Sequence, residues 1–168
     1  MNSSEKAREA ALKKLGSRMR TEKEIADHLK SLDFGAEDIK DALEFLREYK
    51  YVDDSRYCRA YYTYARAKGK AQYRIIKELE QKGIPAAVAK TAFEDMEAEP
   101  ELGEEPVSDR DAAMEVGLKM ARQQEASGKD FDQKFLARVG RRLAGLGYSS
   151  DICYYIMNKL KDYGKEDE

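Results

Sequence analysis

Apolar residues recur every three or four positions along almost the whole chain, and polar or charged residues separate them. This spacing places the apolar side chains on one face of a helix. Ile25 and Leu29 form one such stripe, and Ile39 and Leu43 form the next. No pair of strands can be identified. The pattern therefore predicts an all-α protein, and we expect nine helices.

Residues that favour helix termini mark where these helices begin. Thr21 and Glu24 have the spacing of a capping box, in which both side chains accept from free N–H groups at a helix start. Asp53 and Asp54 supply acceptors at the positive end of a later helix. The other expected starts are Ser3 or Ser4, Pro85, Ser108, Asp130 or Asp132, and Ser149 or Ser150.

The helical pattern repeats within the chain. A series of residues in the middle of the chain has the same spacing as a later series, and the two superpose without a gap. The middle series is Ile75, Leu79, Gly83, Ile84, Val88 and Ala92, and the later one is Val139, Leu143, Gly147, Tyr148, Ile152 and Ile156. Both contain a glycine followed by an apolar residue. The first third matches through Ile25, Leu29, Phe34, Ile39 and Leu43, with one extra residue in the turn.

Each repeat is expected to hold a leading helix, a second helix, a sharp turn with a buried apolar residue, and a third helix. Such tandem units predict an elongated array of three repeats. We place the repeats at residues 1–52, 53–97 and 110–164, with an acidic linker at 98–109 and a polar tail at 165–168.

Charge is segregated along a chain whose net charge is only −2. Between Ser55 and Gly83 there are eight Lys or Arg residues against two Glu. Between Glu94 and Asp111 there are nine acidic residues and one Arg, with two prolines and a glycine. Dense like charge with proline disfavours a packed helix, so we expect a solvated linker or exposed loop there. The basic segment predicts an acidic partner.

No motif for chemistry is found. His28 is the sole histidine, and Cys58 and Cys153 lack partners at metal-ligand spacing, so we expect two small buried hydrophobes. No phosphate-binding glycine motif occurs. We therefore expect no enzyme, no catalytic residue, no metal and no cofactor. Apolar runs are too short for a membrane span and no secretory signal is present, so the chain is expected to be cytoplasmic.

The candidate site is a cationic, tyrosine-rich surface. On a helix, Tyr57, Tyr61 and Tyr64 share one face, which we expect to pack on the core, and Arg59, Tyr62 and Arg66 share another, which we expect to be displayed. A displayed cationic face can neutralise phosphates or acidic protein surface, and the alternative is an ordinary solvated face. The candidate partner-binding residues are Arg56, Arg59, Tyr62, Arg66, Lys68, Lys70, Arg74, Lys77, Lys82, Arg138, Arg141 and Arg142.

The segment Tyr51–Ile84 resembles the central signature of the RecX regulators of the RecA recombinase. Its most specific part is Tyr51-Val-Asp-Asp-x-Arg56-Tyr57. The N-terminal third is also similar, but the last third fits only through the repeat pattern. The acidic segment around Pro100 and Pro106 departs from the family. The remaining matching residues are Ala11, Leu12, Arg18, Arg20, Thr21, Glu22, Glu24, Leu29, Tyr61, Arg66, Gly69, Arg74, Ile75, Glu78, Leu79, Lys82, Gly83 and Ile84.

The resemblance implies a curved, extended, all-helical protein of three tandem three-helix units. It further implies a non-enzymatic regulator in DNA repair that lodges in the groove of the RecA–DNA filament and suppresses ATP hydrolysis and strand exchange. We expect a monomer whose partner is the RecA filament, with weak contact to single- or double-stranded DNA. The alternatives are a stand-alone helical nucleic-acid-binding protein and a helical adaptor for another protein.

Overall fold

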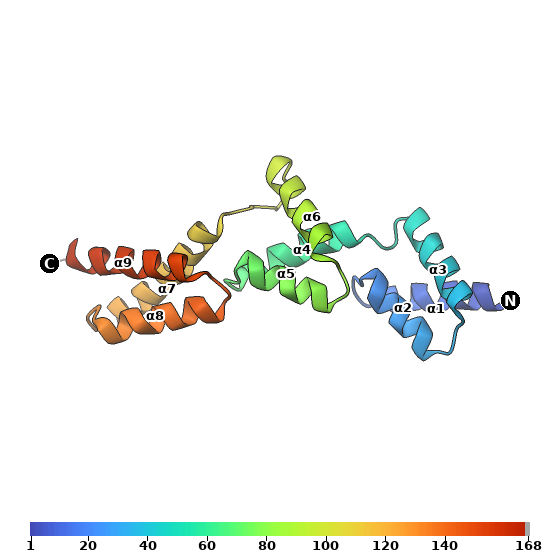
Figure 1. Ribbon diagram of the computed structural model, residues 1–168, viewed down its shortest axis with the longest axis horizontal. Coiled ribbons are helices and arrows are strands. Elements are labelled where there is room, and N and C mark those ends of the chain that lie inside the picture. Colours follow the sequence, from blue (N-terminus) through green and yellow to red (C-terminus); the bar gives the residue numbers. More distant parts are fainter. Residues whose placement is uncertain (167–168) are drawn as a thin grey trace. The chain divides into compact units, whose positions relative to one another are not determined.

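The computed structural model describes residues 1–166, which form nine α-helices and no β-strand (Figure 1). The all-α prediction is confirmed. Within these residues no helix is both long and apolar enough to cross a bilayer. The helices are α1 (Ser3–Leu15), α2 (Glu22–Ser31), α3 (Ala36–Glu48), α4 (Asp54–Ala67), α5 (Gln72–Gln81), α6 (Ala86–Ala98), α7 (Asp109–Ala126), α8 (Gln133–Gly145) and α9 (Ser150–Glu166).

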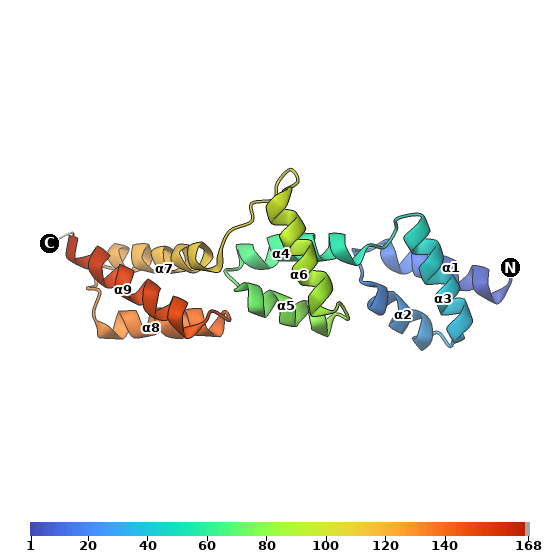
Figure 2. The ribbon, with the colours of Figure 1, turned by 45° about the horizontal axis from the view of Figure 1, so that its top comes forward.

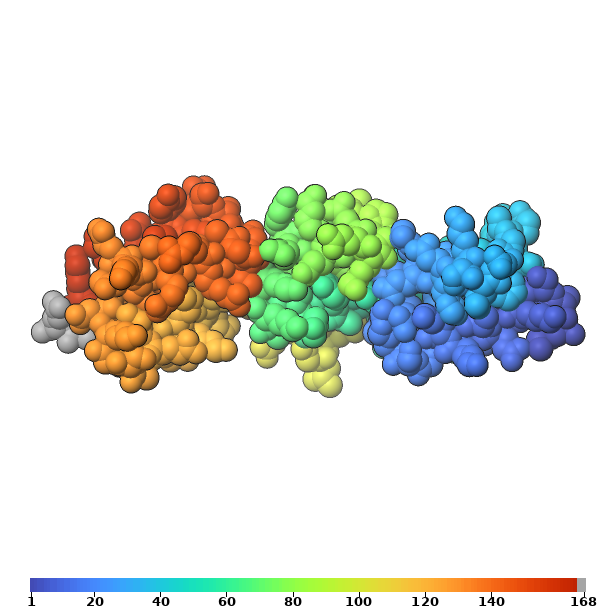
Figure 3. Space-filling model, turned by 90° about the horizontal axis from the view of Figure 1, so that it is seen from below, coloured from blue at the N-terminus to red at the C-terminus, as the bar shows by residue number. Residues whose placement is uncertain are grey.

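The helices form two compact units. Unit 1 comprises Met1–Tyr61 and Ile76–Glu99, and unit 2 comprises Tyr62–Ile75 and the chain from Pro100 onward. Helices α4 and α5 contribute residues to each unit. In unit 1, α1 packs on α2 and α3, and in unit 2, α9 packs on α7 and α8 (Figure 2). Side chains fill the space between the ribbons within each of these groups of three helices (Figure 3).

Each group of three helices has its own apolar core. In unit 1, Ile25, Leu29 and Leu46 are fully buried, with small Ala7 and Ala11 on α1 allowing close packing. In unit 2 the buried residues include Phe135, Val139, Leu143, Ile156 and Leu160. Burial of such side chains contributes roughly 1.5–3 kcal/mol each, so the cores account for much of the stability of each group.

The same turn follows α2, α5 and α8. Asp33, Gly83 and Gly147 have φ values of 65°, 92° and 97°. The N–H of the next residue then bonds to the carbonyl five positions back. The bonds are Phe34 to Leu29 (3.2 Å), Ile84 to Leu79 (3.0 Å) and Tyr148 to Leu143 (3.2 Å). This is the Schellman arrangement that ends a helix and directs the following apolar residue toward the core. The predicted tandem repeat is confirmed.

The first third needs no extra residue in its turn, and that part of the predicted superposition is wrong. Asp33 takes the place of the two glycines, so Ala42, and not Leu43, corresponds to Ala92. Both alanines are buried, at 0% and 1% exposed. Val88 is 37% exposed, which explains why the polar Asp38 can occupy the equivalent position.

A second contact recurs once in each unit, where the start of one short helix meets the end of another. In unit 1 the Thr21 hydroxyl donates to the carbonyl of Lys82 (2.7 Å) and accepts from Glu24 N–H. In unit 2 the N–H of Ala71 donates to the carbonyl of Leu146 (2.9 Å). Lys82 and Leu146 are the residues just before the turn glycines. Each glycine turn therefore abuts the first turn of another helix.

Aspartates complete these junctions. Asp54, the first residue of α4, accepts from the N–H of Glu22 (3.1 Å), and Asp109, the first residue of α7, accepts from the N–H of Gln72 (3.0 Å). The predicted caps at Asp53, Ser108 and Asp132 are confirmed by bonds to the N–H groups three residues later. The cap of α1 is Asn2, and not Ser3 or Ser4.

The acidic segment is only partly non-helical. Helix α6 continues to Ala98 because Phe93 and Met96 are buried, at 4% and 1% exposed. The expectation of a loop from Glu94 to Asp111 was therefore wrong for residues 94–98 and for residues 109–111, which begin α7. Residues 99–108 lie between α6 and α7, and Leu102 is fully exposed there. Of the predicted tail, residues 167–168 lie outside the described part, and α9 includes residues 165–166.

Gly83 should be hard to replace for two reasons. A Cβ at this position would lie 2.3 Å from Cβ of Lys23, an atom that cannot swing away, and φ is +92°. We expect Gly83→Ala to lower the free energy of unfolding by about 2–4 kcal/mol, the sum of left-handed strain and overpacking. Urea denaturation followed by circular dichroism would measure the change.

Gly103→Ala is the matched control. Its φ is +86°, yet nothing lies within 4 Å of the added Cβ. It should therefore cost only the strain, about 1–2 kcal/mol. Equal losses for the two variants would contradict the role assigned to the close approach of α2 and α5.

Candidate partner-binding surface

Helix α4 buries a different face from the one expected. Tyr57, Cys58, Tyr62 and Ala65 are 7%, 0%, 4% and 0% exposed, whereas Tyr64 is 54% exposed. The prediction that Tyr62 is displayed was therefore wrong. Tyrosines on both sides of the helix obscured the choice, but Cys58, Tyr62 and Ala65 mark one stripe at helical spacing.

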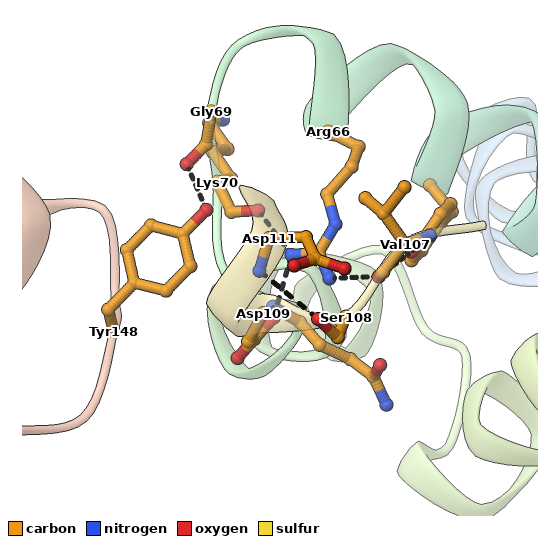
Figure 4. A network of polar contacts seen from close by, with 10 residues as sticks. Arg66, Gly69, Lys70, Val107, Ser108, Asp109, Asp111 and Tyr148 are labelled. Atoms are coloured by element: carbon orange, nitrogen blue, oxygen red, sulfur yellow. Dashed lines mark hydrogen bonds and ion pairs between the residues drawn. The ribbon is translucent and has the colours of Figure 1, made fainter. Parts of the chain in front are cut away.

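Arg66 is also buried, against expectation, with 7% of its side chain exposed. Its guanidinium donates to the carbonyls of Lys70 (2.9 Å) and Val107 (2.8 Å) and to the carboxylate of Asp109 (2.7 Å). Figure 4 shows these acceptors converging on the end of the side chain. Burial is the largest single influence and lowers the pKa of Arg66, but the hydrogen bond to Asp109 and the charge interactions with Tyr62, Asp109 and Tyr148 together outweigh it, so the pKa is raised. Arg66 therefore fastens α4 to the start of α7.

Two tyrosines extend this network inside unit 2. The Tyr62 hydroxyl donates to the carbonyl of Val107 (3.0 Å), and the Arg66 guanidinium lies 5.2 Å from the centre of the Tyr62 ring. The Tyr148 hydroxyl donates to the carbonyl of Gly69 (2.8 Å), and burial raises its pKa to about 12 (Figure 4). These side chains are used for internal contacts, which leaves them little capacity for a partner.

Unit 2 displays a cationic pocket next to this network. The pocket has a volume of about 530 Å³ and brings together Lys68 and Arg142 with Lys119 from α7. Its other lining residues include Val116 and Met120, and Glu115 is the acidic member. All three cationic residues are exposed. Sequence reasoning missed Lys119 because the α7 pattern carries no local cluster of basic residues.

The remaining candidates of unit 2 differ in their exposure and in the internal hydrogen bonds that their side chains make. Arg74 is exposed but donates to the carbonyl of Gly145 (2.7 Å), and Lys70 is half-buried. Arg138 donates to the buried amide of Gln124 (2.9 Å). Arg141 is exposed beside Arg142 on α8. The smaller patch on α8 therefore displays two of its three arginines freely to solvent.

Four candidates lie in unit 1. Arg56 is exposed, and Arg59 donates to the carbonyl of Glu99 (3.1 Å). Lys77 lies 3.5 Å from the carboxylate of Glu80, and Lys82 lies 5.5 Å from the centre of the Tyr61 ring. The exposed ion pair between Lys77 and Glu80 contributes little to stability.

The described residues show no cluster of metal-binding side chains. Within residues 1–166 no three His, Cys, Asp or Glu side chains gather to hold a metal ion. Cys58 and Cys153 are buried free thiols, as expected. Burial raises the pKa of Cys58 to about 12, which keeps it a neutral thiol. Burial also lowers the pKa of His28.

Arg66→Ala should destabilise the protein, because it removes the hydrogen bonds that the guanidinium donates to the Lys70 and Val107 carbonyls and to the Asp109 carboxylate. Breaking a buried pair from one side costs about 3–5 kcal/mol, so a large fall in the urea midpoint is expected. Lys68→Ala, an exposed cation two residues away, is the control and should change stability by no more than about 0.5 kcal/mol. Similar midpoints for the two variants would contradict the structural role of Arg66.

Comparison with known proteins connects this arrangement to one family. A model described as "RecX, first three-helix domain" matches residues 7–46, and one described as "RecX, second three-helix domain" matches residues 53–92. The regulatory protein RecX of Bacillus subtilis is 28% identical over 158 residues, which are 94% of this chain and 56% of that protein. That of Geobacillus thermodenitrificans is 31% identical over 164 residues, 97% of this chain and 57% of that protein. The chain thus spans a little over half the length of these two relatives.

Two solved structures have a fold similar to that of this chain. The crystal structure of RecX from Lactobacillus salivarius matches with a TM-score of 0.74 and 23% identity, over 95% of this chain and 97% of that one. A second crystal structure of a regulatory protein RecX matches with a TM-score of 0.69 and 25% identity, over 93% and 72% of the two chains. The fold, both domain models and the relatives lead to one conclusion: the chain belongs to the RecX family.

Proposed function

We propose that this chain binds the RecA–DNA filament and suppresses its ATP hydrolysis and strand exchange. The observation that carries the proposal is the match of its first two three-helix domains to RecX. The chain's relatives are named regulatory proteins. A regulator of this kind acts by occupying a surface of its partner, so it needs displayed binding groups and no catalytic residues.

The displayed cations provide such groups. Lys68, Lys119 and Arg142 surround the pocket of unit 2, and Glu115 is the one acid in its lining. Their positive charges complement acidic side chains of a recombinase or phosphates of the DNA held within it. Electrostatic complementarity of this kind raises the association rate and selects partners more than it adds raw affinity.

Several weak contacts can add up along a filament. Once one part of the chain has bound, the remaining contacts form at a high effective concentration, so modest patches together give tight binding. Arg56 and Lys77 in unit 1 are exposed and suited to such a contribution. By contrast, Arg66 and Tyr62 act through the fold, because they are buried.

The proposal is tested by titrating the chain into RecA assembled on single-stranded DNA. We expect it to bind the filament and to lower its rate of ATP hydrolysis at micromolar concentration. Changing Lys68, Lys119 and Arg142 together to Glu should weaken binding by on the order of tenfold and reduce its salt dependence. Co-sedimentation and the ATPase rate would measure the two effects.

The control changes three exposed lysines elsewhere, Lys6, Lys13 and Lys90, to Glu. This alters the net charge by the same amount as the test variant. It should leave binding within about twofold, because salt screens exposed charges that do not contact the partner. No binding by the unaltered chain would refute the proposal. Tight, strongly salt-dependent binding to DNA without RecA would support a stand-alone nucleic-acid-binding protein instead.

A further inference from the structure

Unit 1 contains an apolar groove whose lining includes none of the cationic candidates. It has a volume of about 430 Å³ and is formed by α2 and α3. Phe34, Ile39 and Leu43 line it, and each is only half-buried although it packs against the core. A groove of this size lies in the range of sites that accept a few apolar groups.

Internal symmetry shows that this groove is a particular property of the first repeat. The residues equivalent to Phe34, Ile39 and Leu43 in the second repeat are Ile84, Ala89 and Phe93. These are 0%, 0% and 4% exposed. The same positions are thus closed in one repeat and open in the other, although the backbone turn is the same.

The two repeats also differ at a residue that lines the groove. Ala26 lines the groove, and its equivalent in the second repeat is Ile76, which directly follows the buried Ile75 as Ala26 follows Ile25. Ile76 is 8% exposed. An isoleucine side chain in place of Ala26 would occupy space that the alanine leaves open.

The rim of the groove is cationic. Lys30, Lys40 and Arg47 line it, with Asp27 as the one acid. Asp27 is already paired with Lys23 (2.9 Å), and Arg47 with Glu22. Among residues 1–166, Lys30 and Lys40 have no carboxylate within ion-pair distance, and both are exposed. An apolar floor between free lysines complements an apolar stripe flanked by carboxylates.

We propose that this groove binds an acidic amphipathic helix of the protein partner, which under the proposed function is RecA in its filament. Such a helix places apolar residues at i, i+3 and i+4 into the groove and its acidic residues against Lys30 and Lys40. DNA fits the site less well, because a phosphate backbone has no apolar face to cover Phe34, Ile39 and Leu43. The inference rests on the proposed function and specifies one of its contacts.

Ala26→Ile tests the groove with a residue that the fold accepts at the equivalent position 76. The variant should close the groove while leaving the thermal midpoint close to that of the unaltered chain. Binding to RecA filaments on single-stranded DNA should weaken at least about tenfold, the usual effect of losing a buried apolar anchor. Ala87→Ile, at an exposed position of α6, is the matched control and should bind normally.

Charge reversal tests the rim. Lys30→Glu with Lys40→Glu should weaken filament binding by about threefold to tenfold, more at low salt than at high salt. Lys6→Glu with Lys13→Glu makes the same change in net charge on the exposed side of α1 and should have little effect. An equal effect of the two pairs would overturn the assignment of the rim.

The outcomes separate this inference from the function that it refines. No filament binding by the unaltered chain overturns the proposed function and the inference together, whereas equal binding by the Ala26→Ile variant overturns the inference alone. Ala26→Ile weakening DNA binding without RecA would assign the groove to nucleic acid. Loss of a self-associated species by this variant in sedimentation velocity would assign it to a second copy. Either result refutes a protein partner for the groove.

Discussion

The left-handed residue that ends α2, α5 and α8 is the constraint on which the rest of this structure depends. It reverses the chain in one residue and directs Phe34, Ile84 or Tyr148 toward the core. At positions 83 and 147 it also receives the first turn of another helix, so near that a Cβ would clash with Lys23 or Arg74. Glycine is needed there for conformation and for space. The exposed Asp33 meets only the conformational demand, which aspartate tolerates.

The packing of helix ends decides which charged residues are available. Asp54 and Asp109 accept from N–H groups at the starts of α2 and α5. Arg66 is held in the same junction as Asp109, so one of the most prominent basic residues supports the fold. Lys68, two residues further on, is exposed at the cationic pocket. Neighbours on one helix thus serve stability and recognition separately.

Repetition of the backbone leaves room for the repeats to differ at their surfaces. The turn and the buried pair, Ile25 with Leu29 or Ile75 with Leu79, are shared. The position after Ile25 is Ala26, which lines the open groove of the first repeat, and the position after Ile75 is the buried Ile76. A tandem fold can therefore carry different surfaces on the same backbone turn.

The sequence by itself determined the helices, their repeat and the family, because helical spacing, caps and the glycine–apolar turn are local signals. The first turn was predicted with one extra residue, because Asp33 has the left-handed conformation that glycine has in the other two turns. Local patterns could not tell which face of α4 is buried, because Tyr57, Tyr61 and Tyr62 supply apolar surface on both sides. Only the tertiary structure decided that Tyr62 and Arg66 are inside and that Lys119 joins Lys68 and Arg142. Such outcomes depend on residues far apart in the chain, whose packing no local spacing encodes.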